Sequence, residues 1–118
     1  MPALNFSVLT DKVEDGTKRQ TIRLLSKRQF LKGDRLVFYT GMRTKHCRKL
    51  GEAVCKEVKY VAKARRGKWY WLGGFGARQM RPDEYEDLWK RDGFSSAEEF
   101  EEFFDRYPDG TQFQVIRW

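Results

Sequence analysis

Lys18 and Thr21 stand three positions apart in a segment that also carries Arg19 and Arg23. A threonine hydroxyl attacks a carbonyl only after a base has taken its proton, and a lysine can be that base when burial or neighbouring cations lower its pKa. Arg19 and Arg23 would supply such a cationic neighbourhood. The two residues form a candidate nucleophilic pair. The alternative is a strand threonine favoured by its β propensity beside a solvated lysine.

The backbone must bring this pair together, because the spacing alone does not. The segment 18–24 alternates side-chain character and predicts an extended strand. Side chains three positions apart point to opposite faces of an ideal strand, so Lys18 and Thr21 converge only if a turn or bulge lies between them. The faces of this strand are expected to hold Gln20, Ile22 and Leu24 on one side and Arg19, Thr21 and Arg23 on the other.

Runs rich in apolar, β-branched and aromatic residues predict the other strands. They occur at 4–8, 35–40, 69–72 and 113–118, and the longer run 50–62 predicts one twisted strand with a bulge near Cys55. Turns are expected at 31–34 and at the hairpin tip 65–68. About five or six twisted strands bury most surface when the sheet curls or closes, so we expect a curled or closed β-barrel flanked by short helices.

Helical spacing appears in two parts of the chain. A short helical turn near 8–13 is closed by Gly16, and Pro82 starts a helix in which Tyr85, Leu88 and Trp89 lie at i, i+3 and i+4. A further helix begins at Ser95 or Ser96, with Ser95 and Glu98 as a capping box. The apolar stripe of this helix is Phe100, Phe103 and Phe104, opposite Glu98, Glu99, Glu101 and Glu102. The predicted strands and helices together indicate an α+β fold.

The length of 118 residues is ordinary for one domain and too short for two well-packed ones. Nine Phe, five Tyr and four Trp supply large buried surfaces to a single core. No stretch approaches the roughly 20 apolar residues that span a bilayer, and the first residues do not read as a secretion signal. We therefore expect one soluble, cytoplasmic domain over residues 1–118.

Basic and acidic residues are unevenly distributed along the chain. The region 18–68 holds 17 of the 24 Lys and Arg residues and three of the 17 acidic ones, whereas 82–109 holds 11 acidic residues and three basic ones. A molecule polarised in this way can present one face to phosphates, which favours a nucleic-acid partner. The alternative is that lysines decorate exposed strands and protect their edges.

The strand end and loop at 39–45 combine hydroxyls, cations and a glycine, which are the groups that position phosphates. Tyr39 could stack on an unpaired base. Trp69 and Trp71 could do the same, although a domain of this size is expected to use them in its core. The candidate phosphate-binding residues are Arg19, Arg23, Tyr39, Thr40, Gly41, Arg43, Thr44 and Lys45.

Metal and cofactor sites are not expected. Cys47, Cys55 and His46 do not complete a tetrahedral zinc set, and cysteines of a chain without a secretion signal normally stay reduced. The glycine-rich stretch 73–76 lacks the Lys-Ser or Lys-Thr and the following helix of a phosphate-binding loop. We predict no cofactor, no metal and no membrane association.

Five motifs in this order resemble the ASCH superfamily. They are the N-terminal Leu4-Asn5-Phe6, the block Gly16-x-Lys18-x-x-Thr21-Ile22-Arg23, the turn Lys32-Gly33-Asp34, the helix start Asp92-Gly93-Phe94-Ser95 and the closing Phe113-x-Val115-Ile116-Arg117-Trp118. The similarity covers essentially the whole chain, and the Lys-x-x-Thr-Ile-Arg block is its most specific part. The chain is most similar to short ASCH proteins of bacteria and their phages.

The resemblance implies a PUA-like β-barrel with a basic cleft that takes RNA or a nucleotide. Some superfamily members remove the acetyl group from acetylated cytidine nucleosides, and others are described as RNA-binding or ribonucleolytic. In the small amidohydrolases a Lys and a Thr of this block act with a Glu at the helix start. Those positions fall on Lys18, Thr21 and Asp92, so a shorter carboxylate stands in the place of the Glu. Asp92 would orient the lysine or protonate a leaving amine, or alternatively cap the turn at Gly93.

Three functional hypotheses follow. The first is a nucleic-acid-binding module whose basic cleft holds RNA or a modified nucleotide, with Arg23 clamping a phosphate or, alternatively, forming an internal salt bridge. The second is a nucleoside amidohydrolase that uses Lys18, Thr21 and Asp92. The third is a ribonuclease, or a phage protein that engages a host protein through the acidic helical face. If the three catalytic candidates share one cleft, chemistry is favoured, and if they are scattered, binding alone is favoured.

Overall fold

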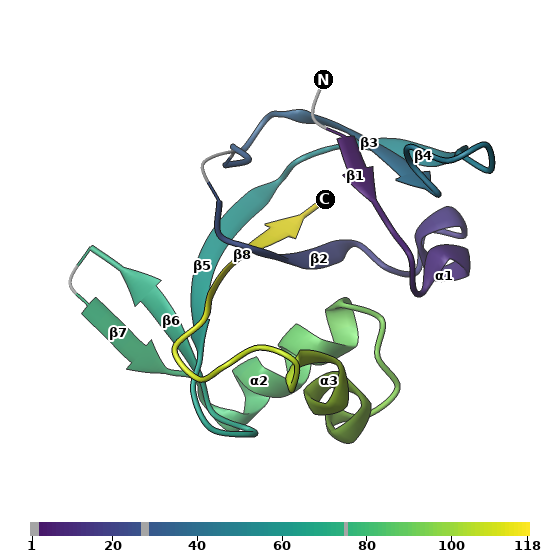
Figure 1. Ribbon diagram of the computed structural model, residues 1–118. Helices are drawn as coiled ribbons and strands as arrows, with labels where there is room; N and C mark the ends of the chain where they lie inside the picture. Colours follow the sequence, from purple (N-terminus) through teal and green to yellow (C-terminus); the bar gives the residue numbers. More distant parts are fainter. Residues whose placement is uncertain (1–2, 27–28, 75) are drawn as a thin grey trace.

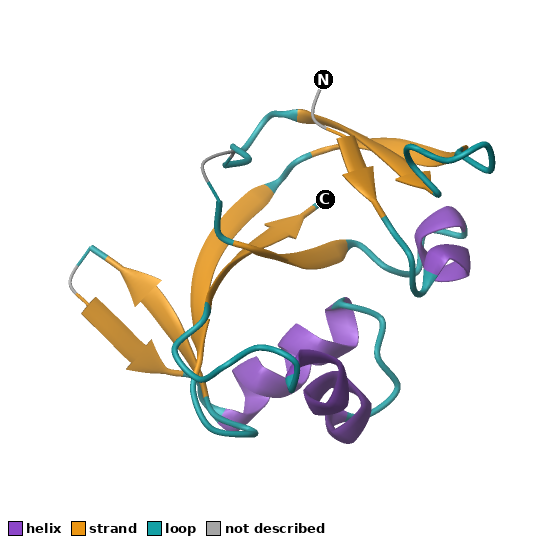
Figure 2. Ribbon diagram, in the orientation of Figure 1, coloured by secondary structure: helices purple, strands orange, loops and turns teal. Residues whose placement is uncertain are grey.

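The computed structural model describes residues 3–26, 29–74 and 76–118. These ranges contain eight strands and three helices (Figures 1 and 2). In chain order they are β1 (Ala3–Asn5), α1 (Thr10–Glu14), β2 (Gln20–Leu24), β3 (Arg35–Thr40), β4 (Arg48–Val54), β5 (Glu57–Lys63), β6 (Trp69–Gly73), β7 (Gly76–Gln79), α2 (Pro82–Arg91), α3 (Ala97–Phe104) and β8 (Gln112–Arg117). The α+β fold class predicted from the sequence is confirmed.

The strands form two sheets. The five-stranded sheet has the order β2-β8-β5-β6-β7 and is antiparallel throughout, which leaves β2 at one edge. The three-stranded sheet has the order β1-β3-β4, with β1 parallel to β3. Figure 1 shows α2 and α3 beneath β2, with α1 beside the end of β1. The edge strand β2 therefore lies between the helices and the N-terminal segment.

Strand β8 joins two hydrophobic clusters because its side chains alternate between the faces of the sheet. Val115 packs with Trp69, Phe100 and Phe104 in the cluster between the five-stranded sheet and the helices. Its neighbour Ile116 packs in the cluster that the sheets share. Both β8 side chains are fully buried, and each contributes about 1.5–3 kcal/mol by leaving water. The core thus holds the helices on one face of β8 and the smaller sheet on the other.

The long strand predicted at 50–62 is two strands in different sheets. The amide of Cys55 donates to the carbonyl of Asp34 beside β3, at 2.8 Å, whereas the amide of Lys56 donates to the carbonyl of Arg117 in β8, also at 2.8 Å. The chain therefore changes its hydrogen-bonding partner within one residue. The observed register shift lies elsewhere, between Phe38 and Tyr39 of β3, where they face β4.

The number of strands also exceeds the expected five or six. Within the described ranges, the pairing gives two separate sheets and does not close into a barrel. The reason is the change of partner at Cys55, which sends β4 to one sheet and β5 to the other. The barrel part of the prediction is not confirmed.

The start of α3 differs by one residue from the predicted capping box. Ser96, not Ser95, is the N-cap, and its hydroxyl accepts a hydrogen bond from the amide of Glu99 at 3.2 Å. Glu101 is buried instead of exposed, because its carboxylate accepts hydrogen bonds from Trp69 Nε1 at 3.1 Å and from the Tyr85 hydroxyl at 2.5 Å. None of the helices in the described part of the chain is long and apolar enough to cross a membrane.

Candidate functional site

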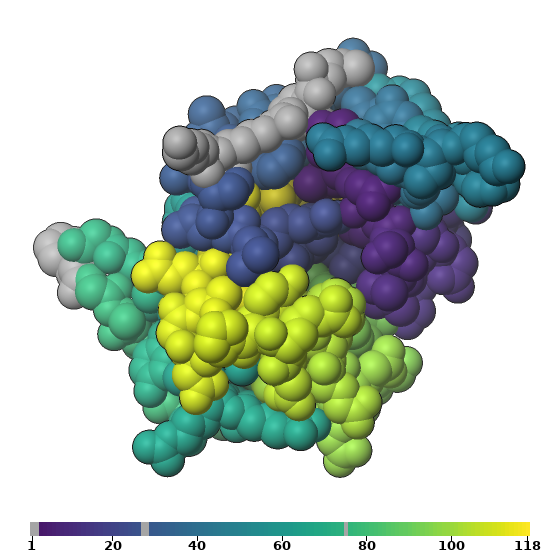
Figure 3. Space-filling model, viewed as in Figure 1, coloured from purple at the N-terminus to yellow at the C-terminus, as the bar shows by residue number. Residues whose placement is uncertain are grey.

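A cavity of about 290 Å³ lies beside β2 and contains all three catalytic candidates. Its polar lining includes Asn5, Lys18, Thr21, Arg23 and Asp92. Figure 3 shows the N-terminal segment in purple, β2 in blue and the green and yellow C-terminal segments meeting on one face of the molecule. Because Lys18, Thr21 and Asp92 share one cavity, the arrangement is the one expected to favour chemistry over binding alone.

Lys18 reaches the cavity because it precedes β2 and does not belong to the strand. The chain leaves α1 through Gly16, whose φ of 83° lies in the left-handed region that favours glycine. The amide of Lys18 then donates to the carbonyl of Lys12 at 2.9 Å, which holds this segment against α1. Thr21 sits within the strand proper. This turn supplies the irregularity that the three-residue spacing required.

Lys18 and Asp92 form a buried ion pair. Lys18 Nζ lies 3.2 Å from Asp92 Oδ2 and donates to the backbone carbonyl of Asp92 at 2.6 Å. The two residues are 4 % and 5 % exposed. Lys18 is therefore not a solvated charge, and the carboxylate of Asp92 bonds to distant residues instead of capping the next turn. The Asp92 side chain is one methylene shorter than the Glu that the ASCH resemblance implies at this position, and its carboxylate nevertheless reaches Lys18.

Burial drives both members of the pair toward their neutral forms. It lowers the pKa of the Lys18 ammonium, while the facing Asp92 carboxylate works in the opposite direction. Burial likewise raises the pKa of the Asp92 carboxyl against the pull of Lys18. The positive charges of Arg23 and Lys12 add to the depression of the lysine pKa. Both shifts favour transfer of a proton from the Lys18 ammonium to the Asp92 carboxylate.

The end of α2 fixes Asp92 in this position. Asp92 is the C-terminal cap of α2, and Gly93 follows with φ 94°, which ends the helix in the left-handed conformation. A Cβ atom at Gly93 would lie 3.4 Å from side-chain carbons of both Leu9 and Lys12, so the glycine also permits close approach of α1. Lys12 Nζ donates to the Gly93 carbonyl at 2.5 Å.

Thr21 is held by Arg23 on the same face of β2. Arg23 Nε donates to Thr21 Oγ1 at 3.0 Å, and Arg23 Nη2 donates to the backbone carbonyl of Asn5 at 2.7 Å. The Arg23 guanidinium also lies 4.7 Å from the ring centroid of Phe6. Arg23 forms no salt bridge among the described residues, so its charge stays available to a ligand in the cavity.

The remaining wall of the cavity is apolar. Phe6 comes from the segment after β1, Phe94 precedes α3, and Phe103, Phe104 and Tyr107 come from the end of α3 and the turn that follows. The rings of Phe94, Phe103, Phe104 and Tyr107 pack edge to face or tilted against one another, for example Phe94 and Phe103 at 5.7 Å between centroids. A site with aromatic walls and a few polar groups suits a small planar ligand.

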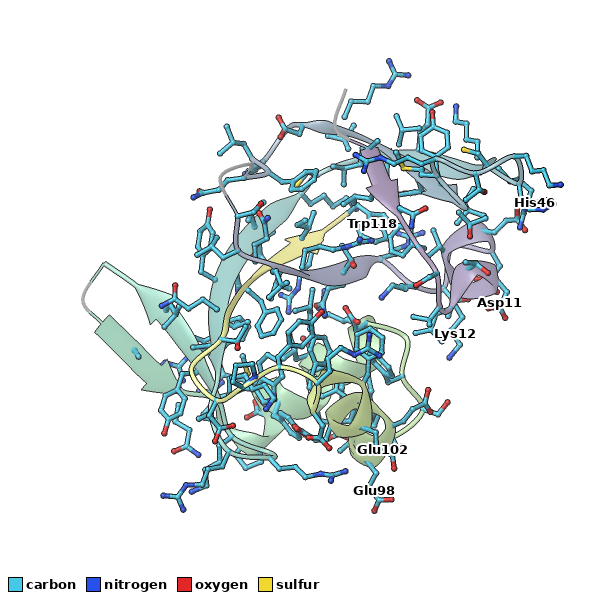
Figure 4. All side chains as sticks on the ribbon, viewed as in Figure 1. Asp11, Lys12, His46, Glu98, Glu102 and Trp118 are labelled. Carbon is cyan, nitrogen blue, oxygen red and sulfur yellow. The ribbon has the colours of Figure 1, made fainter. Side chains whose placement is uncertain are left out.

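The predicted phosphate-binding loop lies outside the cavity but is joined to it. Arg43, Thr44 and Lys45 are exposed, and Figure 4 shows His46 at the outer end of the same loop. Tyr39, Thr40 and Gly41 are half-buried at the end of β3. The backbone amide of Met42 donates to Asn5 Oδ1 at 3.0 Å, and Asn5 lines the cavity.

Arg19 does not take part in the cavity. Its Nε donates to the Gly16 carbonyl at 3.3 Å, and its side chain lines a separate hollow with Glu14 and Trp118. The cationic surroundings of Lys18 therefore come from Arg23 and Lys12, not from Arg19. The sequence placed Arg19 on the same face as Thr21 and Arg23, and this prediction is wrong for Arg19, because β2 begins at Gln20 and strand alternation does not extend to the residue before it.

Two residues near the ion pair were not predicted from the sequence. Gln20 Nε2 donates to Asp92 Oδ1 at 3.2 Å, and Arg117 Nε donates to Gln20 Oε1 at 2.9 Å. The signal for Gln20 was its place in the row with Ile22 and Leu24, because a polar residue in an apolar row needs a buried partner. Arg117 stands in the closing motif, where no spacing singled it out.

The other candidates have structural roles or lie apart. Trp69 is 1 % exposed and belongs to the core, and half-buried Trp71 packs against the same cluster. Cys55 is buried, whereas Cys47 and His46 are exposed on the β3–β4 loop. Among residues 3–26, 29–74 and 76–118, no group of three or more His, Cys, Asp and Glu side chains is placed to hold a metal ion.

The chain matches no family model, no curated protein and no solved structure with which it was compared. The resemblance to the ASCH superfamily therefore rests on the motifs quoted above. The functional proposals rest on the geometry of the cavity.

Proposed function

We propose that the cavity is the active site of an amidohydrolase that removes an acyl group from a nucleoside, with acetylated cytidine as the substrate suggested by the ASCH resemblance. The observation that supports this function is the convergence of Lys18, Thr21 and Asp92 on one cavity from two distant parts of the chain. Their residue types supply a base, a nucleophile and an acid.

The buried pair offers a way to prepare both catalytic groups at once. Transfer of a proton from the Lys18 ammonium to Asp92 Oδ2, 3.2 Å away, leaves a neutral amine and a carboxylic acid. The amine takes the proton of Thr21 as the hydroxyl oxygen bonds to the acyl carbon. The acid gives its proton to the leaving nitrogen when the amide bond breaks. Water then hydrolyses the threonine ester, which releases acetate and restores the hydroxyl.

Arg23 supports two parts of this chemistry. Its Nε already donates to Thr21 Oγ1 at 3.0 Å, and a donated hydrogen bond from a cation stabilises the negative charge that develops on this oxygen. The guanidinium lies over Phe6 at the cavity wall and can donate to the acyl oxygen of a bound substrate. Lys18 and Thr21 have no direct hydrogen bond in the described part of the chain, so the substrate or a water must bridge them.

The dimensions of the cavity favour a nucleoside over a polynucleotide. A volume of about 290 Å³ lies at the lower end of the ~300–1,000 Å³ usual for small-molecule sites. The aromatic lining that includes Phe6 and Tyr107 offers flat surfaces to a base, and Lys18, Thr21, Arg23 and Asp92 line the same cavity.

The test is the release of cytidine from acetylcytidine by the purified protein, followed by the absorbance change of the base. Wild type should turn over the substrate, and Thr21→Val should reduce the rate at least about 100-fold, because it removes the nucleophile while keeping a β-branched side chain. Thr17→Val is the matched control, since Thr17 is exposed four positions earlier and is not part of the cavity lining. Equal rates in the two variants would reject Thr21 as nucleophile.

Nucleic-acid binding is the second candidate, and the exposed loop favours it. Arg43 and Lys45 face solvent, and the loop is tied through Met42 and Asn5 to the cavity. A nucleotide whose base occupied the cavity would leave its phosphates near cations of this kind. This arrangement supports a protein that acts on, or holds, a modified base within RNA.

A further inference from the structure

A chain of polar side chains runs from the surface to the ion pair through the five-stranded sheet. Glu57 Oε1 accepts a hydrogen bond from Arg117 Nη1 at 2.9 Å, and Arg117 Nε donates to Gln20 Oε1 at 2.9 Å. Gln20 Nε2 donates to Asp92 Oδ1 at 3.2 Å and to the Leu88 carbonyl at 2.9 Å. Gln20 is fully buried, so these contacts with described residues replace the hydrogen bonds that its amide would make with water.

The direction of every bond in this chain is determined by Arg117. A guanidinium can only donate, so the atom of Gln20 that faces it must be the carbonyl oxygen. The amide nitrogen of Gln20 must then face Asp92 and the Leu88 carbonyl, to which it donates both of its protons. The amide of Gln20 is therefore held in one orientation.

This orientation makes the two oxygens of Asp92 unequal. Oδ1 accepts a hydrogen bond from Gln20 Nε2, while Oδ2 lies 3.2 Å from Lys18 Nζ. A protonated Oδ1 would place two donors against each other, whereas a proton on Oδ2 can be shared with the lysine. We propose that Gln20, held by Arg117, is a positioning residue that assigns the exchangeable proton of Asp92 to Oδ2. Its importance for turnover rests on the proposed amidohydrolase function.

Several charged groups surround the Asp92 carboxyl and affect its ionisation directly or through a neighbour. Lys18, in the segment before β2, and Arg23, on β2, favour the ionised form of Asp92 by their positive charges. Lys12, on α1, lowers the pKa of Lys18 by its positive charge. On the far side of Gln20, Arg117 is neutralised by Glu57, and Asp87 on α2 lies 3.9 Å from Arg117 Nη2. Gln20 is the neutral link between the two charged clusters.

The direct test is the pKa of the Asp92 carboxyl, followed by carbon-13 NMR of its side chain as pH is changed. Gln20→Leu removes a hydrogen bond that favours the ionised form, so the pKa should rise by about 1 unit relative to wild type. Gln114→Leu is the matched control, because Gln114 is also a buried glutamine of the same sheet and its Oε1 accepts a hydrogen bond from the amide of Phe30 at 3.3 Å. This control should leave the Asp92 pKa at the wild-type value.

Arg117→Met provides a second variant that keeps Gln20 itself. It frees the Gln20 amide to rotate, so the Asp92 pKa should rise in the same direction by a smaller amount. If Gln20→Leu does not fold, this variant decides the question. An Asp92 pKa that is unchanged in Arg117→Met or Gln20→Leu, or that moves equally in Gln114→Leu, overturns the positioning role.

The pH profile of deacylation separates this proposal from the proposed function. In an active enzyme, Gln20→Leu should shift the limb of the kcat profile that reports Asp92 in the direction of the NMR shift, with KM changed little. If wild type has no activity while the NMR shift is found, the amidohydrolase fails and the positioning role stands. If activity is present and the NMR shift is absent, the positioning role fails alone.

Discussion

Lys18 Nζ bonds both to the backbone carbonyl of Asp92, at 2.6 Å, and to its carboxylate, at 3.2 Å, although the two residues are 74 positions apart. The pair joins the segment before β2 to the end of α2. Because both side chains are almost fully buried, each depends on the other for its charge to be compensated. The same contact is therefore a structural link between the sheet and the helices and the centre of the proposed chemistry.

Breaking this pair from one side should be costly. Lys18→Met leaves a buried carboxylate without its cation, and unfolding in urea should show a loss of about 3 kcal/mol. Combining Lys18→Met with Asp92→Asn should cost less than the single change, because no buried charge is left alone. Losses below about 1 kcal/mol in the Lys18→Met variant would mean that water compensates the carboxylate.

Asp92→Glu tests the fit of the shorter carboxylate. Since Asp92 already reaches Lys18 and Gln20 at 3.2 Å, an extra methylene has no new partner to gain and must be accommodated in a buried position. We expect a stability loss of about 1–3 kcal/mol and slower deacylation. Thermal melting and the turnover rate measure the two effects. A faster variant of unchanged stability would show that the reach of the acid limits this protein.

Gly93→Ala tests the helix end that places Asp92. An alanine would occupy the left-handed region at a cost of about 1–2 kcal/mol, and its Cβ would lie 3.4 Å from side-chain carbons of Leu9 and Lys12, at the tight end of ordinary contact. Gly110→Ala is the matched control, because Gly110 has φ 90° and open space around its Cβ position. The Gly93 variant should be the less stable of the two in urea unfolding. Equal losses would attribute the whole effect to the backbone.

The sequence predicts some strands of the fold with their exact bounds, but it does not predict the contacts that form the cavity. The strand at 35–40 was predicted with its observed bounds, because β-branched and aromatic residues between turn residues leave few other readings. That Lys18 and Thr21 line one cavity could not be predicted from their spacing, since it depends on how the chain leaves α1. Asp92 was reached through the family resemblance, and local patterns carry no information about a partner 74 residues away.

The two-sheet arrangement was missed for a related reason. The run 50–62 reads as one strand because strand periodicity continues through Cys55, and periodicity does not say which strand each part pairs with. Gln20 was placed on the correct face, but its row was read only as a packing face. A glutamine among apolar residues predicts a buried hydrogen-bond partner without identifying it.

Acid should weaken the protein partly through Glu84 at the start of α2. Hydrogen bonds from Arg78 and from the amide of Arg81 lower the pKa of Glu84 to about 2. A lowered carboxyl pKa adds stability that is present above its unfolded value of 4.5 and disappears as pH falls toward about 2. Glu84→Gln should therefore lose less stability than wild type between these pH values, as measured by urea unfolding. Parallel pH profiles would remove Glu84 from the acid response.

Nucleic-acid binding, if present, should depend on salt through the β3–β4 loop. The combined change Arg43→Ala and Lys45→Ala should reduce the slope of log K against log salt for single-stranded RNA by about 1.4, or about 0.7 for each lost phosphate contact. Arg65→Ala with Lys68→Ala removes the same charge from the exposed β5–β6 turn and is the control. Identical slopes in the two double variants would reject a specific role for the loop.

A double-mutant cycle on the deacylation of acetylcytidine determines whether Lys18 and Thr21 act as one catalytic unit in the cavity. The rates of wild type, Lys18→Met, Thr21→Val and the double variant are compared under conditions in which all four are folded. If the two residues act together, each single change should abolish turnover to about the level of the double variant. If the rate losses of the two single variants multiply in the double variant, or if the single variants are as fast as wild type, Lys18 and Thr21 do not act as a unit and the cavity remains a binding site.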